Sequence, residues 1–358
     1  MKLLVVIPTW NRANHLDKAI GAIAAARAVA RAADGACEVE LFISNNCSTD
    51  HTVEVVARWQ DTAPWIHLRT WEEHTSNWPQ IVNRAFSGSA LDYDYAWLQG
   101  DDDWITDDTA YQQVMQALEA GSDQPPAILH CCQARRALPG DARILSGLTE
   151  DLCNTYGWHD LLGWISSLVI SRDTVTRMLA SPQFAMSSHS AYFHSEILLE
   201  AAYGQPMLIL ARGLIDQQDE KQTAECMERW AKAGVGAAYW GIIPGLLNMK
   251  ERGVLTAPLT IAFFRYLTYS FWDRFSVETM TLAVNRDTPE EIIATKLQLL
   301  GHFTNLLGYG EDRKLYQNWL EGFTDDIHEV RESTNMIFRR LESLGRPSYS
   351  FELLSSRD

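Results

Sequence analysis

The sequence has 358 residues, of which 46% are hydrophobic and 21% charged, so its composition is that of a globular protein rather than a disordered or fibrous one. This length predicts two domains. The formal net charge is −16, from 30 Lys and Arg against 46 Asp and Glu. An acidic surface repels a phosphate backbone and a bare anionic membrane, so we expect no nucleic-acid partner.

The number and spacing of the cysteines and the length of the apolar runs indicate the cellular compartment of the protein. The six cysteines, at positions 37, 47, 131, 132, 153 and 226, show no CxxC pair and no metal-ligand spacing. We expect free, buried thiols in a reducing cytosol. The apolar run Leu3–Ile7 is too short for a secretory signal, and we expect no segment that spans a bilayer. These features predict a cytoplasmic protein.

The first hundred residues alternate between short apolar runs and helical patterns. Expected strands are Leu3–Ile7, Val39–Ile43, Ile66–Thr70 and Tyr95–Leu98. Helices are expected between them, starting at Asn11 or Asn14, at Ser48 or Asp50, and at Ser76 or Asn77. This alternation predicts an α/β fold with a doubly wound, mostly parallel sheet. In such sheets ligands bind beyond the carboxyl ends of the strands.

The pattern changes in the second half of the chain. Ile128–Cys132 and Leu168–Ser171 are two further expected strands. Long helical stretches follow, the first at Thr223–Ala233 and the last at Asp325–Leu344. We therefore predict a ligand-binding domain over residues 1–220 and an α-helical domain over residues 221–358.

Three acids follow the expected strand Tyr95–Leu98. Asp101, Asp102 and Asp103 repel one another unless a cation or solvent lies between them. Oxygen ligands suit Mg²⁺ or Mn²⁺, which complete their coordination with substrate phosphates. The alternative is a solvated acidic turn or helix cap, but the position after a buried strand favours a metal site.

Two more polar segments follow expected strands. The segment from Pro8 to Arg12 offers a hydroxyl at Thr9, an amide at Asn11 and a guanidinium, which could hold a base and a phosphate. The segment Ser44–Asp50 contains amides that match the edge of a nucleobase. A plain turn with a helix cap is the alternative for both segments.

Together the three segments resemble the family-2 inverting glycosyltransferases, which have the GT-A fold. That family opens with a strand followed by Pro, Thr or Ser, an aromatic residue, Asn and Arg, which Ile7–Arg12 matches. Its second motif, Asp-Asp/Asn-Gly-Ser-Thr-Asp, falls on Asn45–Asp50, and its Asp-rich motif on Trp97–Asp103. The resemblance covers residues 1–215, and the third motif is similar to that of abequosyltransferase-like enzymes of O-antigen assembly.

The resemblance implies roles for individual residues. Nucleotide-sugar binding falls on Pro8, Thr9, Asn11, Arg12, Asn45, Asn77, Asp101 and Asp102. The metal falls on Asp101 or Asp103, because the family's Asp-rich motif can be aligned either with Gln99–Asp102 or with Asp101–Asp103. Two departures stand out, since the family's base-contacting Asp is Asn45 here and its Gly is Cys47. Asn77 has a second interpretation, as a helix cap.

The resemblance also implies a carboxylate base on a later helix and an acceptor-side segment. Glu196 is the first choice for the base and His194 the second, with a surface helix side chain as the alternative for each. Trp164 and Ser166 lie in the acceptor-side segment, where Trp164 could stack on a sugar or pack in the core.

These observations predict a metal-dependent inverting glycosyltransferase that uses Mn²⁺ or Mg²⁺. It would move a hexosyl or deoxyhexosyl group from a nucleotide sugar to a glycan or lipid-linked glycan in surface polysaccharide or glycoconjugate synthesis. The helical domain would shape the acceptor pocket, form a homo-oligomer contact or hold the enzyme peripherally at the inner face of a membrane. In the last case the aromatic-rich segment Pro258–Trp272 would lie on the membrane surface. The alternatives are a metal-dependent nucleotidyltransferase and a non-catalytic nucleotide-binding subunit.

Overall fold

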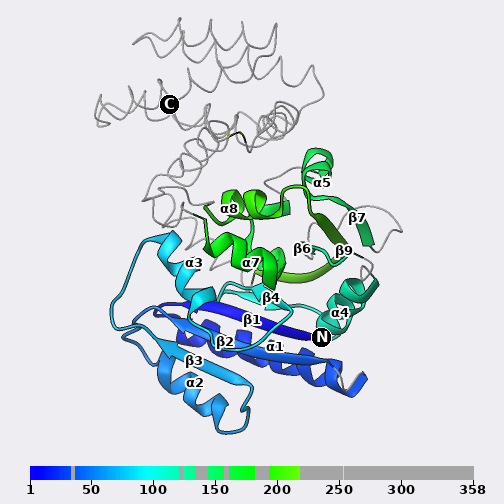
Figure 1. Ribbon diagram of the computed structural model, residues 1–358. Coiled ribbons are helices and arrows are strands. Elements are labelled where there is room, and N and C mark those ends of the chain that lie inside the picture. The colour runs from blue at the N-terminus through cyan, green and yellow to red at the C-terminus, as the bar shows by residue number, and fades with distance from the viewer. Residues whose placement is uncertain are drawn as a thin grey trace, which may run out of the picture.

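The computed structural model describes residues 1–33, 37–120, 124–133, 144–156, 161–181, 193–217 and Gly253. One nine-stranded sheet runs through this part of the chain, in the order β3-β2-β1-β4-β8-β6-β9-β5, with β7 paired to β9 (Figure 1). The strands are β1 (Lys2–Thr9), β2 (Glu38–Asn45), β3 (Ile66–Thr70), β4 (Tyr95–Leu98), β5 (Asp103–Ile105), β6 (Ile128–Gln133), β7 (Ile144–Leu148), β8 (Leu168–Ser171) and β9 (Pro206–Gln217).

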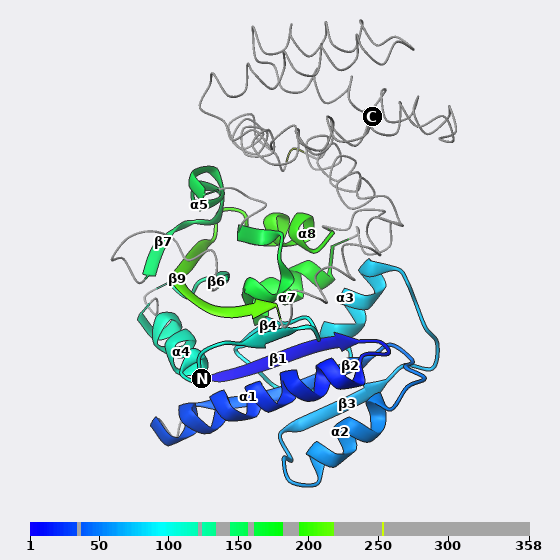
Figure 2. The same cartoon turned by 180° about the vertical axis from the view of Figure 1, so that it is seen from behind.

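Helices cover both faces of the sheet. They are α1 (Ala13–Ala33), α2 (Thr52–Gln60), α3 (Trp78–Ser87), α4 (Ala110–Ala120), α5 (Thr149–Tyr156), α7 (Arg172–Leu179) and α8 (Phe193–Ala202), with a single 3₁₀ turn, η2 (Ile165–Ser167). α1 packs against α2 and α4 on one face, whereas α3, α7 and α8 contact one another on the other (Figures 1 and 2). This is the layered α/β architecture that the strand–helix alternation predicts.

The two halves of the sheet differ in strand direction. β3, β2, β1 and β4 are parallel neighbours, as expected. β8 is antiparallel to both β4 and β6, and β5 and β7 are antiparallel to β9. All six expected strands exist. β5, β7 and β9 were not predicted. β5 has only three residues and follows directly on the acidic turn, so it carries no clear apolar signal. β9 does contain an apolar run, Met207–Ala211, although no strand was expected there.

The core explains why β1 is an uninterrupted apolar run. Leu3–Ile7 are each 1% exposed or less, because helices cover the strand on both sides. On one face the strand packs against α1, whose Leu16, Ile20 and Ile23 recur at helical spacing.

Several expectations concern residues outside this description. They are the domain 221–358, the helical stretches between Thr223 and Leu344, the segment Pro258–Trp272 and Cys226. The cysteines at positions 37, 47, 131, 132 and 153 are thiols rather than halves of disulfides, and all except Cys47 are buried. Among the described residues, each helix is too short or too polar to cross a bilayer.

Candidate functional site

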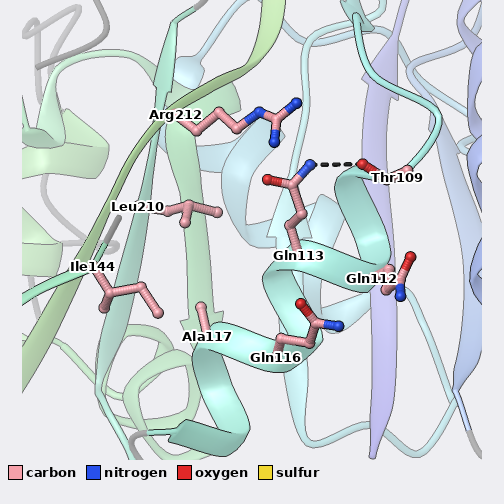
Figure 3. A pocket seen from close by; sticks show the side chains of 8 residues that line it. All are labelled: Thr109, Gln112, Gln113, Gln116, Ala117, Ile144, Leu210 and Arg212. Carbon is pink, nitrogen blue, oxygen red and sulfur yellow. Dashed lines mark hydrogen bonds between the residues drawn. The ribbon is translucent and has the colours of Figure 1, made fainter. Parts of the chain in front are cut away.

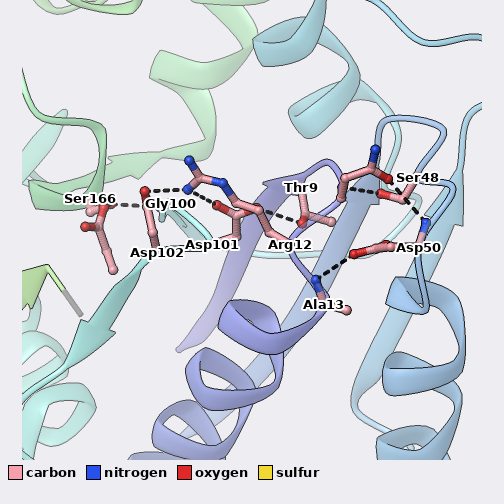
Figure 4. Close-up of polar contacts among 11 residues, drawn as sticks. Thr9, Arg12, Ala13, Ser48, Asp50, Gly100, Asp101, Asp102 and Ser166 are labelled. Carbon is pink, nitrogen blue, oxygen red and sulfur yellow. Dashed lines mark hydrogen bonds and ion pairs between the residues drawn. The ribbon is translucent and has the colours of Figure 1, made fainter. Parts of the chain in front are cut away.

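The three polar segments meet at the carboxyl edge of the parallel strands. β1 and β2 run in register, with Pro8 opposite Ser44 and Thr9 opposite Asn45. β4 pairs with β1 on its other side and leads directly into the Asp triplet. Figure 4 shows side chains from all three segments converging there. The three segments thus gather at the edge where α/β sheets bind their ligands, and their role in ligand binding stays a prediction.

Asn11 ties the first loop to the second. Its backbone lies in the left-handed region at φ 53°, which Asn tolerates better than most residues. Its Oδ1 accepts hydrogen bonds from the backbone N–H of Thr49 at 2.7 Å and of Asp50 at 3.3 Å, and its own N–H donates to Ser48 Oγ at 2.9 Å. The Asn11 carboxamide oxygen is thus engaged within the fold.

Asp50 organises two helix ends. α1 begins at Ala13, whose N–H donates to Asp50 Oδ2 at 3.1 Å, and the Thr52 N–H donates to Oδ1 at 3.1 Å. Burial raises the pKa of Asp50, but the hydrogen bond from the Thr52 hydroxyl and the two backbone hydrogen bonds outweigh it and hold the pKa below its usual value. The cap expected from Asn11 or Asn14 is therefore supplied by the neighbouring loop.

Asn45 is fully buried and braces the second loop. Its Oδ1 accepts from the Ser48 N–H at 3.0 Å, and its Nδ2 donates to Thr70 Oγ1 at 3.2 Å. Cys47, at the position of the family glycine, has φ 62°. This left-handed backbone is the conformation that favours Gly. A base contact by Asn45 stays a prediction, and it would require these bonds to be exchanged.

A second polar cluster lies beside the same loops and was not anticipated. Asn46 Oδ1 accepts from the Thr75 N–H at 3.1 Å and from Arg84 Nη1 at 3.0 Å. The His74 ring lies against Trp10, with centroids 4.3 Å apart and planes tilted by 31°. Trp10 is 46% exposed, so it offers an aromatic face at the strand edge. Trp10 stands in the first motif, whereas His74 and Arg84 carry no sequence signal because they are distant along the chain.

Asp101 is held by the first loop. Its Oδ2 accepts from Thr9 Oγ1 at 2.7 Å, and its Oδ1 lies 3.1 Å from Arg12 Nη1, which also forms an ion pair with Asp102 (Figure 4). Asp101 is only 7% exposed. Burial raises its pKa to about 6, and the Asp102 charge adds to this rise, whereas the Arg12 charge opposes it.

Asp103 belongs to the sheet rather than to an open turn, because it is the first residue of β5. Ser166 Oγ donates to its Oδ2 and accepts from the Gly100 N–H at 2.8 Å. Burial and the Asp102 charge raise the pKa of Asp103 to about 8, which the hydrogen bond from Ser166 and the nearby Trp164 indole partly offset.

The structure gives Ser166 a different role from the acceptor contact that the resemblance implies. The residue is completely buried and supports the Asp triplet, so its side chain does not face an acceptor. Trp164 is half-buried and packs against the main core cluster, which favours the core interpretation over sugar stacking.

The carboxylates fit a divalent cation. In the part of the chain that is described, no three His, Cys, Asp or Glu side chains form a ready-made metal cage. Mg²⁺ and similar cations do not require one, since they commonly use one or two carboxylates with substrate phosphates. Asp103 Oδ1 is buried and makes no hydrogen bond to any described residue, which leaves acceptor capacity for a cation.

The two candidate bases lie on α8, and neither is a surface side chain. Glu196 is 2% and His194 4% exposed. His194 Nδ1 accepts from the Trp78 indole N–H at 3.2 Å, so its proton lies on Nε2, 3.2 Å from the Gly163 carbonyl oxygen. His194 as a base is therefore corrected: both ring nitrogens are used to join α3, α8 and the Gly163 loop.

Asn77 is a helix cap in the structure. It precedes α3, and its Oδ1 accepts from the Gln80 N–H at 3.1 Å. This confirms the cap interpretation, while a contact to a diphosphate stays a prediction.

A separate pocket of about 280 Å³ shares no residue with these loops (Figure 3). It is lined by Thr109, Gln112, Gln113, Gln116, Ala117, Ile144, Leu210 and Arg212.

Part of the chain is similar to a known protein family. Residues 4–129 match the family model described as Glycosyl transferase family 2. This part of the chain is therefore similar to that family. The matched region begins within β1 and contains the Asp triplet and every loop between them, which is where the three motifs lie.

A curated relative is also similar to part of the chain. An uncharacterized glycosyltransferase of Mycoplasma genitalium, MG060, is 32% identical over 83 residues, which are 23% of this chain and 26% of the relative. The match thus spans about a quarter of that curated relative's length.

Solved structures resemble the chain in fold. S. aureus TarS 1–349 in complex with UDP has a TM-score of 0.60 at 12% identity, covering 98% of this chain and 94% of that one. The mannosyltransferase PcManGT of Pyrobaculum calidifontis, in complex with GDP-Man and Mn²⁺, has a TM-score of 0.50 at 13% identity, covering 93% and 86%. These likenesses confirm the expected GT-A fold class.

Proposed function

We propose that the protein is a metal-dependent inverting glycosyltransferase, which moves a sugar from a nucleoside diphosphate to an acceptor hydroxyl. The observation that carries the proposal is the pair of buried carboxylates, Asp101 and Asp103, beside the Thr9–Arg12 loop at the carboxyl edge of the sheet. The complexes of TarS with UDP and of PcManGT with GDP-Man and Mn²⁺ support a nucleotide donor and a divalent cation.

Each part of the site has a chemical task. Trp10, exposed and backed by His74, presents a face on which a base can stack. Asp101 and Asp103 would hold Mn²⁺ or Mg²⁺, which neutralises the charge of the leaving diphosphate when bound. Arg12 brings a guanidinium to the same place, where its planar fork suits phosphate oxygens.

Glu196 is the proposed general base. The contact between His194 and Trp78 sets the first turn of α8 against the start of α3, and Glu196 lies in that turn. Its carboxylate would take the proton of the acceptor hydroxyl, whose oxygen attacks the anomeric carbon. The bond from that carbon to the diphosphate oxygen breaks, and the nucleoside diphosphate leaves with the electron pair. One displacement inverts the configuration.

Substrate identity and cellular setting follow the same proposal. The donor sugar is a hexose or deoxyhexose, and the acceptor is a glycan or lipid-linked glycan used in surface polysaccharide or glycoconjugate synthesis. The enzyme would act in the cytoplasm or peripherally at the inner face of a membrane, as a monomer or homo-oligomer. The similarity to abequosyltransferase-like enzymes also stays a prediction.

Thermal shift with a panel of nucleotide sugars and Mn²⁺ tests the proposal. A ligand present at 100 times its Kd stabilises the folded state by about 2.7 kcal/mol, which is readily measured. Asp101→Asn and Asp103→Asn should lose the Mn²⁺-dependent shift and sugar transfer, whereas Asp108→Asn, an exposed control nearby, should keep both.

The outcomes separate the alternatives. Binding without sugar transfer in wild type would indicate a non-catalytic subunit, and release of pyrophosphate would indicate a nucleotidyltransferase. If no nucleoside diphosphate or nucleotide sugar stabilises the protein, the proposal is wrong.

A further inference from the structure

The Arg12 guanidinium is already where a cation would bind. A single nitrogen, Nη1, lies 3.1 Å from Asp101 Oδ1 and also forms an ion pair with Asp102. The Arg12 side chain is 21% exposed, and those of Asp101 and Asp102 are 10% and 28% exposed. Partial burial limits screening by solvent, so this contact is stronger than an ordinary surface ion pair.

Arg12 offsets a repulsion that the loop creates. Asp101 and Asp102 are adjacent carboxylates, and like charges at such separations disfavour each other. Within the described part of the chain, Arg12 is the cation that pairs with the triplet. Arg84 donates instead to Asn46 Oδ1 and to the Glu73 carbonyl oxygen.

A divalent cation on Asp101 would compete with Arg12 for the same oxygen. Two positive groups on one carboxylate oxygen repel each other, so metal binding would require the guanidinium to leave Asp101. A displaced guanidinium needs another anion, and a diphosphate bound to the metal would bring one within its reach.

We propose that Arg12 is an exchangeable counter-ion, which occupies Asp101 before the metal binds and moves to the diphosphate afterwards. This inference rests on the proposed function. The exchange makes metal binding and nucleotide binding mutually dependent. The metal alone must break the ion pair between Arg12 and Asp101 and leaves Arg12 without a new anion. When the nucleotide binds as well, its diphosphate takes the place of Asp101 as the partner of Arg12. Such coupling is reciprocal, so each ligand raises the affinity for the other by the same factor.

Titration of the full-length chain with Mn²⁺ alone, followed by calorimetry, tests the exchange without relying on turnover. Arg12→Gln should bind Mn²⁺ alone about tenfold more tightly than wild type, within the range of ordinary coupling between sites. UDP or GDP should then raise Mn²⁺ affinity strongly in wild type and little in the variant.

Two further variants keep the test interpretable. Arg12→Lys retains the charge without the planar fork, so it should restore the weak binding of Mn²⁺ alone but only part of the gain from the nucleotide. Arg58→Gln removes an exposed arginine 3.9 Å from Asp17 and should behave as wild type.

Failure of the inference and failure of the proposed function are distinguishable. If Arg12→Gln binds Mn²⁺ alone no more tightly than wild type, while nucleotide binding by wild type still requires Mn²⁺, the counter-ion exchange is refuted and the function stands. If wild type and variants bind neither Mn²⁺ nor a nucleoside diphosphate, the proposed function and the exchange are both refuted.

Discussion

Replacing Ser166 with alanine should destabilise the Asp triplet more than a single lost hydroxyl normally does. The Ser166 hydroxyl accepts from the Gly100 N–H at 2.8 Å and donates to the Asp103 carboxyl, and the residue is fully buried. Because both partners are internal, neither gains water in exchange when the hydroxyl is removed.

The size of the effect follows from these two bonds. A buried N–H left without an acceptor costs about 1–3 kcal/mol, and a hydrogen bond to a carboxyl contributes about 1 kcal/mol or more. We therefore expect Ser166→Ala to lower the free energy of unfolding by about 3 kcal/mol. Ser167→Ala is the matched control, because that buried hydroxyl makes one bond, to the Trp164 carbonyl oxygen at 2.7 Å, and its loss should cost about 1 kcal/mol.

Urea unfolding of both variants at neutral pH without metal measures the difference, and metal binding gives a second readout. The Ser166 bond lowers the pKa of Asp103, so its removal should raise that pKa and move Mn²⁺ binding to higher pH. Equal losses of stability in the two variants, with an unchanged pH profile of Mn²⁺ binding, would refute the supporting role of Ser166.

Three further changes have defined outcomes. Gly100→Ala would put a Cβ 2.7 Å from Asp103 Oδ2, so Mn²⁺ affinity measured by calorimetry should fall by about tenfold or more. Gly21→Ala is the control, because its Cβ would lie 3.9 Å from the Trp59 ring, and it should leave the Mn²⁺ affinity unchanged. Trp78→Phe removes the hydrogen-bond donor to His194 Nδ1, so the free energy of unfolding measured by thermal unfolding should fall by about 1 kcal/mol, with little change in the rate of sugar transfer. A large loss of rate at unchanged stability would contradict the structural role of His194. Burial raises the pKa of Asp103 to about 8, so the folded metal-free chain retains a proton on this carboxyl that the unfolded chain releases above about pH 4. The free energy of unfolding should therefore fall as the pH rises from about 4 to about 8. Asp103→Asn should flatten the upper part of that fall in urea titrations, and an unchanged slope would show that Asp103 is not the group responsible.

The fold was predictable where burial is uniform along an element. Leu3–Ile7 and Tyr95–Leu98 are covered on both faces, so their apolar runs mark strands directly. β5 and the strand directions in the mixed half of the sheet were not predictable in the same way. Asp103 pairs with Gln217 across more than a hundred residues, and that pairing depends on tertiary packing rather than on local pattern.

In the candidate site, too, some residues were predictable from the sequence and others were not. The motifs located Thr9, Arg12 and Asp101 correctly at one edge, since parallel strands end together and the motifs follow strands. The supporting partners were missed or given another role, among them Ser166, His74 and Arg84, because they reach the site from distant segments.

From its amino-acid order alone, the chain could be assigned to an α/β class, because apolar runs and helical patterns carry that information. Its motifs resemble those of a glycosyltransferase family, and that resemblance is the source of the predicted nucleotide-sugar chemistry. Only the tertiary structure decided what each polar group contacts. His194 became a link between helices rather than a base, and Ser166 a support for Asp103 rather than an acceptor contact. The physical reason is burial: a polar side chain enclosed by the fold must find internal partners, and which partners it finds depends on segments that approach from elsewhere in the chain.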